Sequence, residues 1–508
     1  MSRTPHHSPL WNRRDFLRAG AHGVAAGAAL LALPELLRAE LYAPLLRPPK
    51  GPPVRVRGAV RSAGRGVPGV AVSDGLDVVL TGGDGTFELV TTAHRDFLRV
   101  SVPAGHTVPL NPTGTARFYQ PIRPDSRGEM DALFEMEPLR GISDEDHTLF
   151  LLADIQTEDA QEMQWFHERS VPHIRQTLQG MGDHHALGIA CGDIMFDNLE
   201  LYPEYERGVE RMGIPFFQVV GNHDLDQDRR TDEASTTTFS RHFGPRYYSF
   251  DRGRVHYVVL DDVFWHGAGY LGYLGSDQLL WLANDLRHVE AGRPVIVAAH
   301  IPVLGSRHVR EGERNPSTGI SVANREALYR LLEPYDAHIL TGHTHENEHV
   351  FHQGTHEHVS GTVCGAWWSG PICGDGTPAG YSLYEIRGEE VTWRYQTTGR
   401  EPAYQLRVYG PGADPSAPDE IVANVWDWDP EWTVVWYEDG ERKGEMARRV
   451  GTDPLSEELH RGEDLPAHRP WVEPYPTGHL FYAPASRQAR EVRVEATDRF
   501  GRSYSASP

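Results

Sequence analysis

Phe216-Phe-Gln-Val-Val-Gly-Asn222-His223-Asp224 joins an apolar, β-branched run directly to an amide, an imidazole and a carboxylate. An uninterrupted apolar run of this length is typical of a strand that is buried on both faces. Ligands of open α/β sheets gather in the loops that follow the carboxyl ends of such strands. The stretch therefore predicts a buried strand that delivers Asn222, His223 and Asp224 to a binding site.

Four further stretches have the same design, and each ends in side chains that can bind a metal. They are Leu149-Phe-Leu-Leu-Ala-Asp154-Ile-Gln156, Leu187-Gly-Ile-Ala-Cys-Gly-Asp193, Val295-Ile-Val-Ala-Ala-His300 and Ile339-Leu-Thr-Gly-His343-Thr-His345. A single Asp or His at a strand end is most often a capping or surface residue. Five strand ends in this order can instead bring carboxylate, amide and imidazole groups together around cations.

Apolar strands alternate with helical patterns through the middle of the chain. Helices are predicted over residues 160–179, 202–212, 276–289 and 324–335. Ser276 is the expected N-cap of the third helix, with Asp277 in its first turn. The alternation predicts an α/β layered domain over residues 145–390.

All-β segments are predicted on both sides of this domain. Short alternating runs from Val54 onwards, separated by turn residues, indicate a β-sandwich of about 80 residues over 54–140. It resembles the transthyretin-like and carboxypeptidase-regulatory-like modules. Beyond residue 390 the helical patterns fade, and runs such as Trp432-Thr-Val-Val-Trp-Tyr437 predict a smaller β-rich domain over 391–508.

Composition excludes two classes of protein. The 508 residues carry a formal net charge of -22, which would repel the phosphate backbone of a nucleic acid, so nucleic acid is not expected as the principal partner. Three cysteines are too few for a disulfide scaffold. Cys364 and Cys373 are compatible either with a pair or with two separate thiols.

The N-terminus resembles a twin-arginine export signal of bacteria. Arg13-Arg14-Asp15-Phe16-Leu17 precedes a weakly apolar run that extends to Leu33. Residues 1–43 are therefore expected to be a signal peptide and the start of a linker, cleaved near Ala39 or Ala43. The twin-arginine export machinery is then a partner, and the mature protein is periplasmic or secreted without an integral membrane anchor. An arginine-containing tail before an ordinary helix is the alternative.

The ordered set of strand ends resembles the signature of the calcineurin-like metallophosphoesterase family, in its exported bacterial branch with N-terminal and C-terminal β domains. The resemblance implies a four-layer αββα sandwich with two divalent metal ions between its sheets. Gln156 stands where most members have histidine. An amide oxygen is a harder donor than an imidazole, so manganese, magnesium or iron is expected rather than zinc, with manganese or iron favoured.

The resemblance also implies a role for each residue of the motifs. The first metal would be held by Asp154, Gln156, Asp193 and His345, and the second by Asp193, Asn222, His300 and His343. Asp193 would bridge the two cations and offset their repulsion. His223 would stabilise or protonate the departing oxygen, and Asp224 would orient a histidine.

Residues outside the motifs are weaker candidates. Arg307 and Arg310 could contact a phosphate, although a solvated basic loop fits the same pattern. Trp367 and Trp368 could stack on a sugar or base, or pack in the core. The histidines His349, His352, His356 and His358 are predicted to lie on a solvated hairpin rather than in a third metal site.

The leading hypothesis is a two-metal phosphoric ester hydrolase, a phosphatase or phosphodiesterase, in which a metal-bound hydroxide attacks phosphorus. Its substrate would be a phosphorylated small molecule or an envelope component. The alternative is an exported polysaccharide-binding or scaffold protein built on a phosphoesterase core. The complete ligand set favours the enzyme, because a scaffold has no chemical need for it. The oligomeric state stays open.

Overall fold

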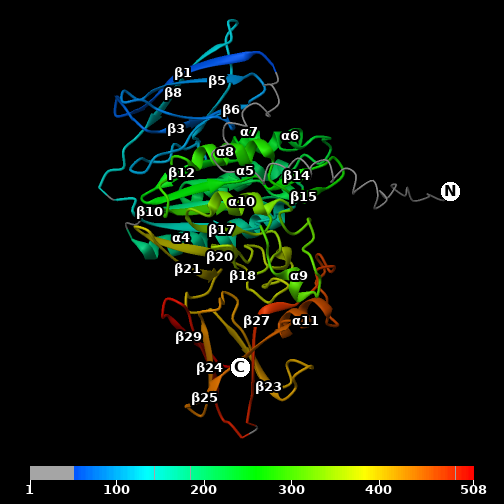
Figure 1. Cartoon of the computed structure of the whole chain (residues 1–508). Helices are drawn as coiled ribbons and strands as arrows, with labels where there is room; N and C mark the ends of the chain where they lie inside the picture. Colours follow the sequence, from blue (N-terminus) through cyan, green and yellow to red (C-terminus); the bar gives the residue numbers. More distant parts are fainter. Residues whose placement is uncertain (1–50, 142, 183–184, 487) are drawn as a thin grey trace, which may run out of the picture.

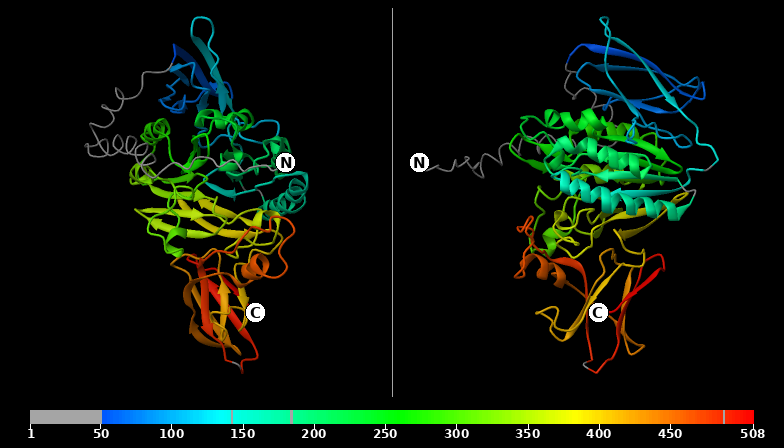
Figure 2. Two further views of the ribbon diagram at one scale, coloured as in Figure 1. Left: turned by 90° about the vertical axis from the view of Figure 1, so that its right-hand side faces the viewer. Right: turned by 180° about the vertical axis from the view of Figure 1, so that it is seen from behind.

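The computed structural model describes residues 51–508 except 142, 183–184 and 487. Three bodies follow one another along a single axis: an N-terminal β domain, a central α/β domain and a C-terminal β domain (Figures 1 and 2). The export signal predicted over residues 1–43 lies outside the described residues. In the described part of the chain, no helix is long and apolar enough to cross a membrane.

The N-terminal domain packs two small sheets face to face. In one sheet β1 pairs with β2, β5 and β8, and the second sheet has the order β4-β3-β6-β7. Alternate residues of β1 point inward, so that Val54, Val56 and Val60 are buried. The strands are β1 (Pro53–Ser62), β2 (Arg65–Gly66), β3 (Ala71–Ser73), β4 (Val78–Leu80), β5 (Thr86–Thr92), β6 (Phe97–Val100), β7 (Tyr119–Pro121) and β8 (Glu129–Met136).

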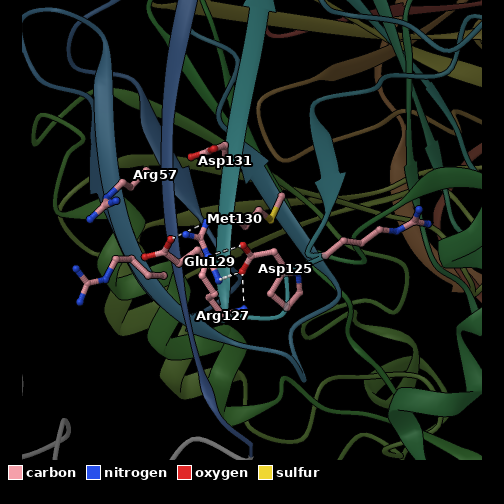
Figure 3. Close-up of a pocket in the computed structure, with 9 residues that line it drawn as sticks. Arg57, Asp125, Arg127, Glu129, Met130 and Asp131 are labelled. Atoms are coloured by element: carbon pink, nitrogen blue, oxygen red, sulfur yellow. Dashed lines mark hydrogen bonds and ion pairs between the residues drawn. The ribbon is translucent and has the colours of Figure 1, made fainter.

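The outer face of this domain carries a shallow depression of about 450 Å³. Arg127 lies there between Asp125 at 3.1 Å and Glu129 at 3.5 Å (Figure 3). These charges are exposed and already paired, and such pairs contribute little. The depression lies on the N-terminal domain, apart from the strand ends that carry the predicted metal ligands.

Two mixed sheets form the centre of the molecule. The first has the order β11-β10-β9-β20-β21 and the second the order β12-β13-β16-β17-β19-β18. The first sheet consists of β9 (Asp146–Leu152), β10 (His185–Cys191), β11 (Phe216–Val219), β20 (Gly380–Arg387) and β21 (Glu390–Thr397). The second consists of β12 (Tyr248–Arg252), β13 (Val255–Val259), β16 (Pro294–Ala298), β17 (Asp336–Thr341), β18 (Glu348–His352) and β19 (Thr355–Val359).

Helices cover the outer face of each sheet, which confirms the predicted αββα order. Tyr205 and Val209 of α5 pack with Phe150 of the first sheet, whereas Trp281 of α8 packs with Val297 of the second. The main helices are α3 (Ala160–Trp165), α4 (Val171–Met181), α5 (Tyr202–Met212), α8 (Ser276–Leu286) and α10 (Arg325–Leu332). A π-helical turn, Phe166–Ser170, joins α3 to α4. Ser276 begins α8 with Gly275 at the cap position, so the prediction of Ser276 as N-cap was wrong.

Short elements surround the strand ends of the central domain. They are η2 (Leu199–Leu201), η3 (Asn222–Asp224), α6 (Asp232–Ser235), α7 (Thr237–Phe243), β14 (Val263–Trp265), β15 (Tyr270–Gly272), α9 (Arg307–Arg310) and η4 (Ala366–Trp368). The first sheet continues beyond residue 390 through β21, which pairs with β20. The last strand of the central domain therefore begins where the sequence places the start of the C-terminal domain.

The C-terminal domain packs the sheets β22-β23-β27-β26 and β25-β24-β28-β29 against each other. Its elements are β22 (Arg407–Tyr409), β23 (Glu420–Asn424), β24 (Thr433–Glu438), β25 (Glu441–Glu445), β26 (Ala447–Gly451), α11 (Pro454–Arg461), β27 (Thr477–Pro484), β28 (Val492–Thr497) and β29 (Ser503–Ala506). The segment between α11 and β27 returns to the central domain, where Arg469 pairs with Glu162 at 2.9 Å. The last domain thus contributes to the surroundings of the predicted site.

Candidate metal centre

Three of the predicted ligands converge on Nε2 of a fourth, His300. This nitrogen lies 3.2 Å from Oδ1 of Asn222, 3.2 Å from Oδ1 of Asp193 and 3.2 Å from Nδ1 of His343. His300 follows β16, Asp193 follows β10, Asn222 follows β11 and His343 follows β17. The ends of both sheets therefore meet at one point, with the second-metal set predicted from the sequence around it.

Hydrogen bonds on the far side of each ring fix which nitrogen faces this point. Nδ1 of His300 donates to the backbone carbonyl of Cys191 at 3.0 Å, and Nε2 of His343 donates to the carbonyl of Gly319 at 2.8 Å. In the neutral form of each ring, the other nitrogen therefore carries no proton and can offer its lone pair to a metal. These nitrogens are Nε2 of His300 and Nδ1 of His343. A histidine that binds a metal is usually held in this way.

The remaining ligands form a second group beside Asp193. Nε2 of His345 lies 3.3 Å from Oδ1 of Asp154. The amide nitrogen of Gln156 donates to Oδ2 of Asp193 at 3.0 Å. The amide oxygen of Gln156 is buried and has no hydrogen-bond partner among the described residues. A buried acceptor without a partner is costly unless a cation or a water completes it, so this oxygen fits a metal ligand.

Five of the candidate ligands have left-handed backbone conformations. The φ angles are +48° at Asp154, +46° at Gln156, +45° at Asp193, +67° at His343 and +53° at His345. Non-glycine residues rarely adopt such angles, and strain of this kind clusters at functional sites. The strained positions coincide with the strand ends that the sequence singled out.

Three ligands are each preceded by a glycine at which any side chain would clash with a neighbouring loop. A Cβ atom on Gly342 would lie 2.4 Å from Oδ2 of Asp154, and one on Gly221 would lie 2.0 Å from the backbone nitrogen of Asp193. A Cβ atom on Gly192 would lie 2.3 Å from Nδ1 of His300. The ligand loops therefore approach one another as closely as a bare backbone allows.

Electrostatics favour a positive charge where the ligands converge. Burial lowers the pKa of His300, but the charge and hydrogen bond of Asp193, together with the charge of Asp154 and the carbonyl of Cys191, outweigh burial and raise that pKa to about 10. Burial acts in the opposite sense on Asp193, whose pKa is nevertheless held well below its usual range by His300 and His223. The site thus stabilises the ionised carboxylate of Asp193 and a positive charge beside it. The mixed oxygen and nitrogen donors suit a divalent transition metal.

Asp224 has a different role from the one predicted. Its carboxylate accepts hydrogen bonds from the backbone nitrogens of Ile194, Met195 and Gly221 and from the hydroxyl of Tyr202, at 3.0 to 3.1 Å. It therefore joins the two loops that carry Asp193 and Asn222, and within the part of the chain that the structure describes its carboxylate accepts no hydrogen bond from a histidine.

His223 lies beside the ligands and is held by two neighbours. Nδ1 of His223 contacts Oδ1 of Asp197 at 2.8 Å, and its ring stacks on Phe196 with 4.3 Å between the ring centroids. Burial lowers the pKa of His223, but Asp193 and Asp197 outweigh it and raise that pKa above its ordinary value. Asp197, which sequence reasoning did not assign to the site, is thus the partner of His223. In the sequence, its position four residues after Asp193 is the feature by which Asp197 could have been found.

The weaker candidates have mixed outcomes. Arg310 is buried in ion pairs with Glu346 and Glu348, so it is not free to hold a phosphate. The guanidinium of Arg307 pairs with Glu311 at 2.9 Å, and its carbon atom lies 4.1 Å from the centroid of the Tyr475 ring.

The two tryptophans have separate surroundings. Nε1 of Trp367 donates to Nε2 of His345 at 3.0 Å, which places this ring at the edge of the site. Trp368 is buried and donates to the carbonyl of Ile155 at 2.9 Å, so it belongs to the core.

Two further expectations concern residues away from the site. The hairpin that carries His349, His356 and His358 exists as β18 and β19, but the prediction that it is solvated was wrong, because His356 and His358 are buried. Cys364 and Cys373 are buried free thiols, each in contact with the hydroxyl of Thr362.

Two facing mixed sheets, with carboxylate, amide and imidazole groups between their ends, define a metallohydrolase fold and centre. Comparison with known sequences gives the family. Residues 147–347 match the calcineurin-like phosphoesterase model, residues 54–139 match the N terminal of calcineurin-like phosphoesterase, and residues 357–504 match its C terminal. The chain belongs to the calcineurin-like phosphoesterase family, as the sequence resemblance predicted.

Curated relatives and solved structures resemble parts of the chain. A serine/threonine-protein phosphatase CPPED1 from Bos taurus is 28% identical over 185 residues, and the protein of that name from Mus musculus is 25% identical over 217. The alignments cover 36% and 41% of this chain and span 55% and 66% of the two relatives. A dimetal phosphatase structure from Danio rerio has a TM-score of 0.34 at 14% identity, covering 49% of this chain and 96% of that one. A purple acid phosphatase from yellow lupin has a TM-score of 0.33 at 14% identity, covering 59% and 53%.

Proposed function

We propose that this protein hydrolyses phosphoric esters at a centre of two divalent cations. The observation that carries the proposal is the convergence of Asp193, Asn222 and His343 on Nε2 of His300, each at 3.2 Å. The unpartnered amide oxygen of Gln156 supports a cation on the other side of Asp193. When bound, the cations supply Lewis acidity towards phosphoryl oxygens and lower the pKa of water.

His223 is the proposed general acid. Its Nδ1–H donates to Asp197, which leaves Nε2 as the position that can give a proton to the departing oxygen. Because Asp193 and Asp197 raise the pKa of His223, the imidazole is more often cationic near neutral pH than a free histidine is. Phe196 stacks on the ring and fixes its plane. Asp224 holds the neighbouring loops, which keeps His223 and Asp193 at a constant separation.

The proposed substrate is a phosphorylated small molecule or an envelope component. Two tryptophans at the edge of the site, Trp367 and Trp471, support a ligand with an apolar or ring-shaped group, because their rings lie 4.3 Å apart and Trp471 is 55% exposed. Manganese or iron is the proposed metal, since Gln156 and Asn222 contribute hard amide oxygens.

The test is an assay of the full-length protein after metal removal and reloading with manganese. We expect hydrolysis of p-nitrophenyl phosphate or bis-p-nitrophenyl phosphate, loss of activity with EDTA and recovery with manganese. Asp193→Asn is expected to lose both activity and bound metal, whereas Arg461→Ala, at an exposed ion pair with Glu457, is the matched control. A metal-loaded wild-type sample that is inactive on a broad ester panel would contradict the proposal.

We also propose that the protein acts outside the cytoplasm. The support is the Arg13-Arg14 motif followed by an apolar run, which is the order of a twin-arginine signal. A fusion of residues 1–43 to a reporter that fluoresces after folded export tests this. Export that is lost when both arginines become lysine is the expected outcome, and export that does not depend on the arginines would refute it.

A further inference from the structure

Four histidines project from one face of three neighbouring strands in the second sheet. β17 pairs with β19 so that His338 lies beside His356, and β18 pairs with β19 so that His349 lies beside His358. Residues two apart on a strand share a face, so His356 and His358 point the same way. Glu357 points to the other face, where it accepts hydrogen bonds from the backbone of Leu304 and its neighbours.

The ring nitrogens are spaced as ligands of one metal would be. Nδ1 of His338 lies 3.0 Å from Nε2 of His358, and Nδ1 of His349 lies 3.0 Å from Nε2 of His356. One nitrogen each from His338, His356 and His358 falls within 4.8 Å of the other two. Two imidazoles on one tetrahedral zinc ion have nitrogens roughly 3.4 Å apart, given Zn–N bonds of about 2.1 Å.

These rings are buried, and one nitrogen lacks a partner. His358 is 2% exposed, and its Nδ1 has no hydrogen-bond partner among the described residues. Burial, followed by the neighbouring histidines, holds the pKa of His356 and His358 well below the ordinary value. Burial lowers the pKa of His338 to about 4. The rings are therefore neutral at physiological pH, which is the state that binds a metal.

Residues behind the cluster hold it in place. Nε2 of His349 contacts Oδ1 of Asp427 at 3.1 Å, and the other oxygen of Asp427 accepts from the backbone nitrogen of Tyr395 at 3.0 Å. A carboxylate behind an imidazole fixes the ring and raises its basicity. Trp393 closes one side, with its ring centroid 4.9 Å from that of His356 and 4.8 Å from that of His358.

A solvent path reaches the cluster. His338 and His356 line an open depression of about 610 Å³, whose rim includes the carboxylates of Asp336 and Glu390. Arg499 also lines it, but its charge is offset by Asp429 at 2.8 Å and Glu431 at 3.0 Å.

The cluster is separate from the candidate dinuclear centre. His338 lies near the start of β17, whereas His343 follows its end. Five residues of extended chain correspond to roughly 16 Å.

We infer that His338, His356 and His358 form an additional metal site for a zinc-like divalent cation, with His349 and Asp427 positioning the rings from behind. Neutral imidazoles without oxygen donors favour zinc, copper or nickel over manganese. This separates the additional site from the oxygen-rich dinuclear centre. Through His349 and Asp427 a cation there would also tie β17, β18 and β19 to the C-terminal domain.

The test compares zinc content across variants of the full-length protein. His356→Asn is expected to retain one equivalent of zinc fewer than wild type after loading and desalting, with unchanged phosphoesterase activity. Its matched control is His352→Asn, on the same hairpin but outside the cluster, which is expected to retain the wild-type zinc content. Equal zinc content in a folded His356→Asn protein would overturn the site.

A second measurement does not depend on a variant that folds. Wild-type crystals soaked in zinc and measured at the zinc absorption edge are expected to show an anomalous peak among the rings of His338, His356 and His358. Absence of that peak, while the dinuclear centre shows zinc, would overturn the inference and leave the proposed hydrolase activity standing.

Discussion

His223 and Asp197 make the clearest prediction about single side chains. We expect His223→Gln to lower kcat by about 10²- to 10⁴-fold, the usual contribution of a general acid. Bound metal should stay unchanged, because His223 is not among the converging ligands. The loss should be smaller for a p-nitrophenol leaving group, which needs little protonation, than for an alkyl alcohol.

Asp197→Asn is expected to give a smaller loss of kcat with the same dependence on the leaving group, because the neutral amide holds the His223 ring less firmly. The exposed Asp228, which pairs with Arg229 at 3.4 Å, offers Asp228→Asn as the control. Equal losses for good and poor leaving groups would argue against a proton transfer by His223.

Substitution of Gly342 tests how closely the ligand loops pack against each other. Its Cβ would lie 2.4 Å from Oδ2 of Asp154, so Gly342→Ala must displace either that carboxylate or His343. We expect metal affinity to fall by about 10- to 100-fold, as it does when the support of a ligand is disturbed. Gly83→Ala is the control, since nothing lies within 4 Å of its added Cβ. Isothermal titration with manganese measures both, and unchanged affinity in Gly342→Ala would show that the loop can move away.

The position of a side chain could be predicted from the sequence where it depends on residues close to it in the chain. The strand ends from Asp154 to His345 follow from apolar runs that stop at ligand residues, and the structure brings them together. Their roles as ligands stay predictions. The partners of Arg310 and Asp224 could not be predicted from the sequence, because Glu346, Glu348 and the loop amides reach them from distant parts of the chain.

A histidine of strand β13 connects β12 to α8 through two ion pairs that depend on its protonation. His256 lies 3.0 Å from Asp251 of β12 and 3.0 Å from Asp285 of α8. Burial lowers its pKa, but the two carboxylates outweigh burial and raise it to about 9. A raised pKa means that the protonated form stabilises the fold, fully below about pH 6.5.

We therefore expect the free energy of unfolding to fall as pH rises from about 6.5 to 9, by up to about 3 kcal/mol. Denaturant unfolding of wild type against His256→Gln measures this, because the variant should lack that share of the pH dependence. His266→Gln, at an exposed histidine, should keep it. Parallel pH curves for wild type and His256→Gln would contradict the link.

Elements were predicted best where the apolar period is strong. The helix expected over 202–212 is α5, Tyr202–Met212. The hairpin of β18 and β19 was placed in solvent because its histidines look polar, and its burial depends on Trp393 of β21 and on Asp427 of the C-terminal domain. Such packing between distant segments leaves no periodic trace in the sequence.

A buried ion pair ties the C-terminal domain to the central domain beside the site. Arg469 contacts Glu162, which is 1% exposed, and its guanidinium carbon lies 4.6 Å from the centroid of the Phe196 ring. Removing one partner of a buried pair usually costs about 3–5 kcal/mol. We expect Arg469→Ala to lower Tm clearly and to lower kcat as well, because Phe196 supports His223.

Arg461→Ala is the matched variant in the same segment. Its pairs with Glu457 and Glu473 are exposed, so a cost of at most about 1 kcal/mol is expected. Thermal unfolding followed by circular dichroism compares the two. Similar Tm values for both variants would show that the C-terminal segment contributes little to the central domain.

Tyr475 completes this connection, since its hydroxyl donates to the backbone carbonyls of Thr344 and His345. The loop of a predicted metal ligand is thus braced by a residue that the ribosome adds 130 residues later. A growing chain carries every predicted ligand well before it carries that brace. During translation the predicted ligand set is therefore complete before the residue that braces the last of its loops has been added.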